Sequence, residues 1–323
     1  MSKIAIVTGI LGQDGPYLAE YLLKKDYRVY GMIRRYSNPN FENLNYLGIT
    51  DSIEYIEGDL TDESSLNNII KNIRPDEVYN LAAQSFVGSS WEQAKLTTDI
   101  NAVGVLNLLS SIKLLSPRTR FYQASTSEMF GVSHDNGFQD ESTPFHPRSP
   151  YGIAKVYAYW MTINFRESYG MYTANGILFN HESPLRGIQF VTRKITDGVA
   201  QIKAGLSKEL RLGNLDAKRD WGFAGDYVEA MYLMLQQEAP DDFVVATGEN
   251  HSVKEFVEFA FSTVGLDYKQ YVHIDPRFKR PAEVPNLCGK ARKAEKLLGW
   301  KPKTAFKDLV KMMVEADVKR YQK

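Results

Sequence analysis

Short apolar runs alternate with amphipathic helical segments along residues 4–124, and few folds accommodate that pattern. The runs at 4–7, 28–33, 53–56, 77–82 and 120–124 have the length and apolar character of buried parallel strands. Helical spacing is found between them at 18–23, 64–73 and 100–115. The alternation predicts an α/β protein with a doubly wound parallel sheet, whose ligands bind beyond the carboxyl ends of the strands.

The pattern loosens beyond about residue 180, where proline and glycine interrupt shorter elements. Helical spacing is still recognisable at 253–264, 290–298 and 306–321. We therefore expect two domains. Residues 1–179 form a dinucleotide-binding domain, to which later segments return, and residues 180–323 form mainly a smaller substrate-binding domain.

Composition limits the partners and the compartment. The chain has 39 basic and 39 acidic residues, and this balance argues against a nucleic-acid-binding or membrane-binding surface. Cys288 is the single cysteine, so no disulfide forms within the chain, which fits a cytoplasmic location. No apolar run approaches the ~20 residues of a membrane span, and the first residues lack the apolar region of a signal peptide.

A glycine-containing loop joins the first run to the first helical segment, with the spacing G-x-x-G-x-x-G. Glycine permits a tight turn and lets backbone N–H groups approach a pyrophosphate at the N-terminus of the helix. Between a strand and a helix, such a loop indicates a Rossmann-type dinucleotide site. The predicted cofactor contacts in the loop are Thr8, Gly9, Gly12, Gln13, Asp14 and Gly15.

The end of the second run indicates which dinucleotide binds. An NAD site usually carries Asp or Glu there, which bonds the 2′-hydroxyl of the ribose. This chain has Arg34 and Arg35 instead, followed by Ser37. Guanidinium groups suit a 2′-phosphate, because they make charge-assisted bidentate contacts with it. NADP is therefore the predicted cofactor.

The ends of the third and fourth runs supply further predicted contacts. Asp59 follows the third run and is expected to bond the adenine amino group. Small residues follow the fourth run and let the backbone lie against the cofactor. The predicted contacts at these two ends are Asp59, Leu60, Leu81, Ala82, Ala83 and Ser85.

A Ser-Thr-Ser-Glu segment follows the fifth run, and a Tyr-x-x-x-Lys pair comes after it. Tyr151 and Lys155 lie four residues apart, so they share one face of a helix. The ammonium is expected to lower the pKa of Tyr151 and to hold the nicotinamide ribose. The phenolate could then take the proton of a sugar hydroxyl while hydride leaves the carbon. Thr126 would share a hydrogen bond with that hydroxyl.

Glu128 changes the expected reaction from oxidation to elimination. Oxidation at C4 of a sugar makes the C5 proton acidic, because this proton lies next to the new ketone, and a positioned carboxylate can remove it. The resulting carboxylic acid can protonate the departing C6 hydroxyl, and the hydride returns to C6. The sequence thus predicts a redox-neutral dehydration that involves no metal.

These motifs resemble those of the extended short-chain dehydrogenase/reductases, and within them those of the GDP-mannose 4,6-dehydratase family. The resemblance extends over nearly the whole chain, through the segments 8–15, 80–85, 123–128, 147–155, 176–184, 190–194 and 213–221. It implies a lyase of nucleotide-sugar and deoxysugar biosynthesis. The implied reaction converts GDP-D-mannose to GDP-4-keto-6-deoxy-D-mannose and water.

The resemblance also implies roles for single residues. The implied catalytic residues are Thr126, Glu128, Tyr151 and Lys155. The implied further cofactor contacts are His181 and Arg186. The implied GDP-sugar contacts are Ser85, Thr126, Glu128, Asn180, Lys194, Arg219, Arg280 and Glu283. The residues themselves support part of this set, because Lys194, Arg219 and Arg280 bring positive charge to the domain that must bind a pyrophosphate.

The stretch 34–43 is polar, aromatic and rich in turn residues, unlike a strand or helix of the sheet. It begins at the arginines assigned to the 2′-phosphate, so it should lie near the cofactor. The family resemblance implies that this loop reaches into a neighbouring subunit. We expect a homo-oligomer, specifically a tetramer. The alternative is a dimer formed by the helices at 100–115 and 151–169.

Other activities stay open from the sequence. A GDP-manno-heptose 4,6-dehydratase would use the same catalytic residues, with more room beyond C6. A reductase of the 4-keto product or a C4 epimerase would not need Glu128, and an epimerase would normally use NAD. A regulator that senses NADP without catalysis could lose Tyr151 and Lys155, and both are present.

Overall fold

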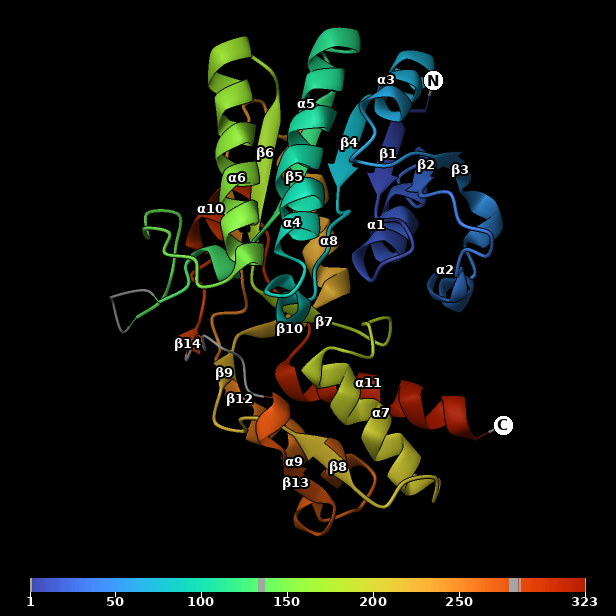
Figure 1. The fold of residues 1–323 in the computed structure, drawn as a ribbon, viewed down its shortest axis with the longest axis vertical. Coiled ribbons are helices and arrows are strands. Elements are labelled where there is room, and N and C mark those ends of the chain that lie inside the picture. The colour runs from blue at the N-terminus through green and yellow to red at the C-terminus, as the bar shows by residue number, and fades with distance from the viewer. Residues whose placement is uncertain (1, 133–136, 279–283, 285, 323) are drawn as a thin grey trace.

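A parallel sheet of seven strands forms the centre of the protein, in the order β11-β6-β5-β4-β1-β2-β3 (Figure 1). The structure is a computed structural model that describes residues 2–132, 137–278, 284 and 286–322. The strands are β1 (Ile4–Thr8), β2 (Arg28–Ile33), β3 (Glu54–Glu57), β4 (Glu77–Asn80), β5 (Arg120–Thr126), β6 (Thr173–Leu178) and β11 (Phe243–Val245). The strand order reverses between β1 and β4, and an open α/β sheet forms its ligand crevice at such a point. The predicted fold class is confirmed.

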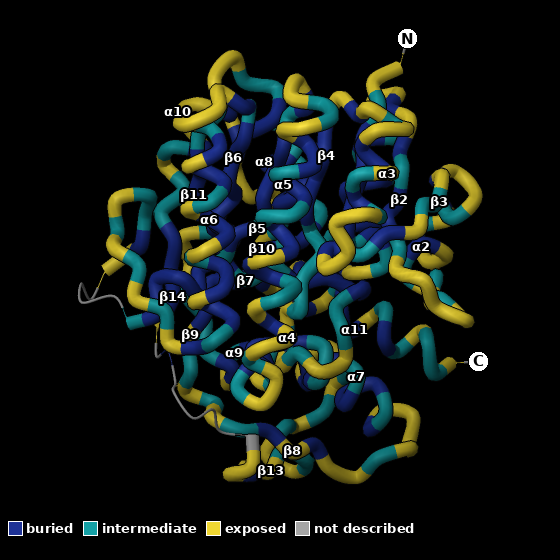
Figure 2. The backbone as a smooth tube through the Cα atoms, turned by 45° about the horizontal axis from the view of Figure 1, so that its top comes forward, coloured by how far each residue is buried: buried dark blue, intermediate teal, exposed yellow. Residues whose placement is uncertain are grey.

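Helices cover both faces of this sheet. One face is covered by α3 (Glu63–Ile73), α5 (Gly104–Leu115) and α6 (Pro150–Tyr169). The other is covered by α1 (Asp14–Leu23), α2 (Glu42–Leu47), α8 (Ala224–Gln236) and α10 (Arg292–Leu298). Successive side chains of a strand point to opposite faces. Ile6 therefore packs in the layer of α3, α5 and α6, and Val7 packs in the layer of α1 and α8. Figure 2 shows the strands buried between these layers.

Two helices begin or divide differently from the sequence prediction. The helix predicted at 18–23 already begins at Asp14, where an acidic side chain in the first turn interacts favourably with the helix dipole. The helix predicted at 100–115 is instead a continuous path of three parts. They are α4 (Ala94–Thr98), a π-helical turn (Asp99–Val103) and α5. The π-helical turn shifts the helical register and places its side chains differently from a regular helix.

The central sheet takes its last strand from the second half of the chain. The sequence did not predict β6, because its TANGIL segment mixes small and polar residues with apolar ones, although all six are buried. β11 pairs in parallel with β6. The helix α8, which was also not predicted, packs on the sheet face that α1 covers.

The remaining elements form a second layer of structure beyond the carboxyl ends of the strands (Figure 1). Its helices are α7 (Val191–Lys203), α9 (Val253–Thr263) and α11 (Phe306–Tyr321). Its strand groups are β7 (Asn180–Glu182) with β10 (Trp221–Phe223), β9 (Lys218–Arg219) with β12 (His251–Ser252) and β14 (Asn286–Leu287), and β8 (Leu210–Leu212) with β13 (Val272–Ile274). A separate apolar core joins these helices around Trp221, Phe256 and Phe306. We call this part the second lobe.

The start of α6 shows how the local sequence sets a helix boundary near the site. Ser149 has an extended backbone, and its hydroxyl accepts a hydrogen bond from the backbone N–H of Gly152 at 3.0 Å. Pro150 follows in the first turn, where its missing N–H is not needed. Within the described residues, no helix is both long enough and apolar enough to cross a lipid bilayer.

Candidate active site

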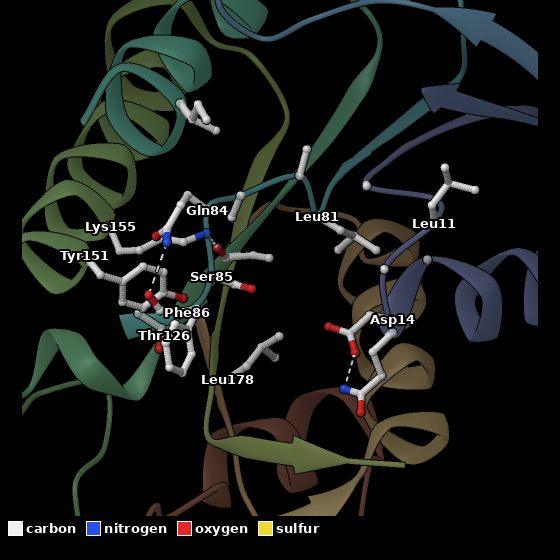
Figure 3. A pocket seen from close by; sticks show the side chains of 18 of the residues that line it. Leu11, Asp14, Leu81, Gln84, Ser85, Phe86, Thr126, Tyr151, Lys155 and Leu178 are labelled. Atoms are coloured by element: carbon white, nitrogen blue, oxygen red, sulfur yellow. Dashed lines mark hydrogen bonds between the residues drawn. The ribbon is translucent and has the colours of Figure 1, made fainter. Parts of the chain in front are cut away.

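A cleft of about 700 Å³ opens at the carboxyl ends of the central strands and extends to the second lobe. Figure 3 shows its lining from close by. The residues that the sequence predicted for the site and that line the cleft are Gly9, Gly12, Gln13, Asp14, Gly15, Arg34, Asp59, Leu60, Leu81, Ala82, Ala83, Ser85, Thr126, Glu128, Tyr151, Lys155, Asn180, His181 and Arg186. Segments far apart in the chain are therefore brought together here.

Five predicted site residues that the structure describes do not line this cleft. Thr8 is buried, and its hydroxyl accepts hydrogen bonds from the backbone N–H groups of Leu81 and Ala82. Arg35 and Ser37 are exposed beyond the end of β2. Lys194 on α7 and Arg219 on β9 lie in the second lobe. Arg280 and Glu283 lie outside the described residues.

The glycine loop passes so close to neighbouring backbone that side chains are excluded from it. Gly9 has a φ of +69°, and a methyl group on it would lie 2.8 Å from the backbone nitrogen of Ala82. A methyl group on Gly15 would lie 2.6 Å from the carbonyl oxygen of Gly9. The loop therefore needs glycine at both positions. The space left in front of the first turn of α1 suits a pyrophosphate, so the residues present fit a dinucleotide.

The second lobe holds the first turn of α1 through a buried network. Nε2 of His181 lies 2.8 Å from Oδ2 of Asp14, and Nδ1 lies 2.8 Å from the carbonyl oxygen of Phe179. Gln13 donates to the backbone carbonyl of His181 at 3.0 Å. Both ring nitrogens of His181 face oxygen acceptors, so the geometry favours the imidazolium form. His181 thus lines the cleft with both nitrogens bonded within the protein.

The pKa values of this pair follow from the same contacts. Burial by itself would raise the pKa of Asp14, but the charge and hydrogen bond of His181, with Gln13 and Arg186, lower it overall. Burial would lower the pKa of His181, but Asp14 and the Phe179 carbonyl raise it overall. The two groups therefore form a buried ion pair between α1 and β7.

The Tyr-x-x-x-Lys pair lies on the first turns of α6, with both side chains nearly buried. Lys155 donates from Nζ to the carbonyl oxygen of Ala124 at 2.8 Å, and Nζ lies 5.9 Å from the centre of the Tyr151 ring. Burial lowers the pKa of Lys155 to about 8, with Asp14 acting in the opposite direction. Glu128 follows β5 in the 3-10 turn Ser127–Met129 and is also buried.

The expected effect of Lys155 on Tyr151 is wrong for this structure. Burial raises the pKa of Tyr151 to about 12, while the hydroxyl of Thr126 lowers it and the charge of Glu128 raises it further. The reason is geometric, because the ammonium points to the Ala124 carbonyl and not to the phenol oxygen. The sequence spacing placed both groups on one helix face but did not determine where Nζ points.

An aromatic pair at the cleft was not predicted. Phe86, after β4, and Phe190, before α7, meet edge to face with ring centres 5.7 Å apart. The guanidinium carbon of Arg186 lies 3.6 Å from the centre of the Phe190 ring. Both aromatic residues line the cleft, from opposite sides of the boundary between the sheet and the second lobe. No local pattern identifies them, because they meet only in the folded chain.

Asn101 is a further residue that the sequence interpretation missed. It lies in the π-helical turn and is 1% exposed. Its amide oxygen accepts from the backbone N–H of Gln84 at 2.8 Å, and its amide nitrogen donates to the Gln84 carbonyl at 2.9 Å. It thereby holds the strand end beside Ser85. Local spacing gave no signal for it, because other polar residues such as Asp99 and Asn107 lie in the same helical stretch, but π-helical turns often mark functional sites.

Comparison with known proteins gives consistent matches over the whole chain. Residues 6–313 match the model of the protein family described as GDP-mannose 4,6 dehydratase. GDP-mannose 4,6 dehydratase 2 of Arabidopsis thaliana is 56% identical, over 98% of this chain and 87% of that protein. GDP-mannose 4,6-dehydratase of Vibrio cholerae is 48% identical, over 100% of this chain and 96% of that protein.

Solved structures share the fold at lower sequence identity. UDP-glucose 4-epimerase of Thermotoga maritima, with UDP-glucose, superposes with a TM-score of 0.88 at 25% identity and covers 99% of this chain and 100% of that one. RMD of Pseudomonas aeruginosa, complexed with NADPH, has a TM-score of 0.83 at 23% identity and covers 99% of both chains. DesIV of Streptomyces venezuelae, a dTDP-glucose 4,6-dehydratase with NAD and TYD bound, has a TM-score of 0.85 at 22% identity, over 97% and 96%.

Proposed function

Because this chain belongs to the GDP-mannose 4,6-dehydratase family, we infer that it removes water from GDP-mannose and releases a GDP-4-keto-6-deoxy sugar. The observation that carries the inference is the placement of Glu128 in the same cleft as Tyr151 and Lys155, beside the glycine loop. An oxidoreductase of this fold needs the last two groups only. The carboxylate adds the acid–base group that elimination requires.

We propose that the cofactor is NADP. The fold neighbours named above hold NAD or NADPH, which supports a nicotinamide dinucleotide in general. The choice of NADP rests on Arg34, which lines the cleft just after β2, where an NAD site would present a carboxylate. When bound, the nicotinamide would accept a hydride from the sugar and give it back.

We propose separate proton-transfer roles for the cleft residues. Tyr151 takes the proton of the C4 hydroxyl, and Thr126 shares a hydrogen bond with that hydroxyl. Glu128 removes the C5 proton and passes a proton to the departing C6 hydroxyl. A tyrosine pKa of about 12 leaves little phenolate near neutral pH, so Tyr151 needs a nearby positive charge in the loaded site. We propose that Lys155 supplies it together with Arg186, whose charge already acts to lower the pKa of Tyr151.

We propose that the second lobe binds the GDP part of the substrate. Asn180 lines the cleft at the start of β7, and Lys194 lies on α7, which follows the cleft residue Phe190. Arg219 lies further along the lobe on β9 and donates to the backbone carbonyl of Val284 at 2.8 Å. The positive charges of Lys194 and Arg219 suit a pyrophosphate.

The proposed reaction is redox neutral, and an isotope experiment tests it directly. Incubation with GDP-mannose deuterated at C4 should give a product that has lost one water and carries the label at C6. Tyr151→Phe is the control, and it should leave the substrate unchanged. Release of the label to solvent, or consumption of one NADP for each sugar, would contradict the proposal.

We propose that the chain works in the cytoplasm as a homotetramer. Ile153, Tyr157 and Trp160 form one outward-facing stripe on α6, and Ile153 and Trp160 are more than half exposed. A stripe of this kind suits pairing of two copies. The exposed segment that begins after Arg34 is the proposed second contact, near the cofactor.

A further inference from the structure

A row of buried polar side chains crosses three neighbouring strands beneath the cleft. Thr8 on β1, Asn80 on β4 and Gln123 on β5 are register partners, and each is at most 1% exposed. The hydroxyl of Thr8 donates to Oδ1 of Asn80 at 2.7 Å. Nδ2 of Asn80 then donates to Oε1 of Gln123 at 2.8 Å. Nε2 of Gln123 donates to the carbonyl oxygen of Ala124 at 3.0 Å.

The direction of this row is determined at the Thr8 end. The oxygen of Thr8 accepts hydrogen bonds from the backbone N–H groups of Leu81 and Ala82, both at 3.0 Å. Its single hydrogen must therefore be the one donated to Asn80, whose amide oxygen has to face Thr8. The amide of Gln123 must follow in the same sense, and its N–H group points to Ala124. The amide dipoles are thus aligned and reinforce one another.

The row ends on the atom that holds Lys155. The carbonyl oxygen of Ala124 accepts from Gln123 on one side and from the ammonium of Lys155, at 2.8 Å, on the other. Within the described residues this carbonyl is the hydrogen-bond acceptor of the ammonium. A buried ammonium is held in place by such bonds, because water does not compensate for their loss.

We propose that Asn80 and Gln123 are positioning residues, which hold the Ala124 carbonyl and thereby determine where the ammonium of Lys155 lies beside Tyr151. Neither residue lines the cleft. The catalytic consequence rests on the proposed function, because it requires the proposed role of Lys155. The position and protonation of Lys155 can be measured in the protein without substrate.

The arrangement has a definite electrostatic consequence. The N–H group of Gln123 competes with the ammonium for one carbonyl oxygen and directs the positive end of its dipole toward it, which disfavours the charged form of Lys155. Loss of this N–H group should therefore raise the pKa of Lys155. The other ionisable groups that line the cleft with Lys155 stay in place in such a variant. They are Tyr151 on α6, Glu128 after β5, Asp14 on α1, and His181 and Arg186 beyond β6.

The test measures the pH at which Lys155 becomes reactive. Cofactor-free protein is acetylated with acetic anhydride over a range of pH, and mass spectrometry quantifies the modification of Lys155. We define the midpoint as the pH at which acetylation of Lys155 is half-maximal. Gln123→Met removes the N–H donor to the Ala124 carbonyl at nearly constant shape and should move this midpoint upward. Gln123→Glu places a carboxylate beside the ammonium and should move it upward by about one pH unit. The alkaline limb of the kcat profile should move in the same direction.

A double variant distinguishes a chain of contacts from independent effects. Asn80→Leu should move the midpoint in the same direction as Gln123→Met but less. It removes the hydrogen bond from Asn80 to the Gln123 amide oxygen, while the Gln123 N–H group stays beside the Ala124 carbonyl. Asn80→Leu/Gln123→Met should move the midpoint no further than Gln123→Met alone, since both changes act through one carbonyl. Additive shifts of the two changes would overturn the proposal.

The matched control is Asn175, the register partner of Gln123 on β6, which is equally buried and bonds to Asp242. Asn175→Leu should lower stability and leave the Lys155 midpoint unchanged. If both Gln123 variants fold and keep the wild-type midpoint, or if Asn175→Leu shifts it equally, the row is structural only and the proposal fails. If the midpoint moves but GDP-mannose is not dehydrated, the positioning stands and the proposed function fails.

Discussion

The carboxylate of Glu128 is the group that turns the proposed reaction from a simple oxidation into an elimination. Its replacement by an amide tests this role. Glu128→Gln should reduce turnover of GDP-mannose by about 10²- to 10⁴-fold, because it removes the proton acceptor for C5. Tyr151→Phe should prevent even the first oxidation. We expect bound reduced cofactor to accumulate in Glu128→Gln only, and absorbance of the nicotinamide measures it in a single turnover.

The control for this substitution is Glu77→Gln, at the opposite end of β4. Glu77 is 1% exposed, and it bonds to Tyr27 and Tyr79 away from the cleft. The same chemical change there should leave turnover intact. Wild-type turnover in Glu128→Gln would show that this carboxylate has a structural role.

Arg34 and Arg35 offer a matched pair for cofactor choice. Arg34 lines the cleft and Arg35 does not. Arg34→Glu should weaken NADP relative to NAD by about 10- to 100-fold, since a hydrogen bond to a charged group contributes about 1.5–3 kcal/mol. Arg35→Glu should change this ratio much less. Titration of each dinucleotide against protein fluorescence gives the two dissociation constants, and a larger effect of Arg35 would contradict the assignment.

At the scale of secondary-structure elements, β7 and α1 are joined by the ion pair of His181 and Asp14. The pKa of His181 is raised in the folded protein, so its contribution to stability is fully present below its unfolded pKa, about 6.5, and is lost as pH rises through the folded value. The pKa of Asp14 is lowered, so its contribution is present above about pH 4 and is lost as pH falls through the folded value. The pair therefore stabilises most between these limits.

His181→Gln should lower the free energy of unfolding by about 2 kcal/mol near pH 6, because it removes a charged hydrogen bond in a buried site. The deficit relative to wild type should shrink as pH rises above the raised pKa of His181. Thermal unfolding of both proteins at several pH values measures it. His273→Gln, at an exposed position on β13, is the control and should show no such trend. A deficit that is constant with pH would mean that His181 is neutral in the folded protein.

At the scale of the whole molecule, the prediction concerns assembly. Trp160→Glu places a charge in the exposed apolar stripe of α6 and should reduce the particle mass measured by light scattering. Leu206→Glu is the control, because Leu206 is equally apolar and 65% exposed but lies after α7 in the second lobe. An unchanged mass in Trp160→Glu would exclude this face as the contact.

Removal of residues 36–43 tests the second proposed contact. The truncated protein should form a smaller assembly and lose bound NADP faster, because a neighbouring chain would no longer cover the cofactor. Retention of both the mass and the bound NADP would show that the segment has no such part.

Much of the fold and of the candidate site follows from local sequence patterns. β2 lies where the run at 28–33 predicted it, and α11 begins and ends as predicted at 306–321. The cleft brings together the glycine loop, the residue pair on α6 and Glu128, because each lies at a strand end or a helix start that short-range spacing specifies. Parallel strands then place those ends at one edge of the sheet.

Other features depend on contacts between segments distant in the chain, and only the tertiary structure decided them. Local spacing could not show that Thr8 points beneath the cleft or that His181 bonds to Asp14. The pKa of Tyr151 moved opposite to expectation, because burial and the direction of Nζ of Lys155 arise only when α6 packs on β5. Sequence patterns determine which residues reach the site, and packing determines which atoms meet there and in what charge state.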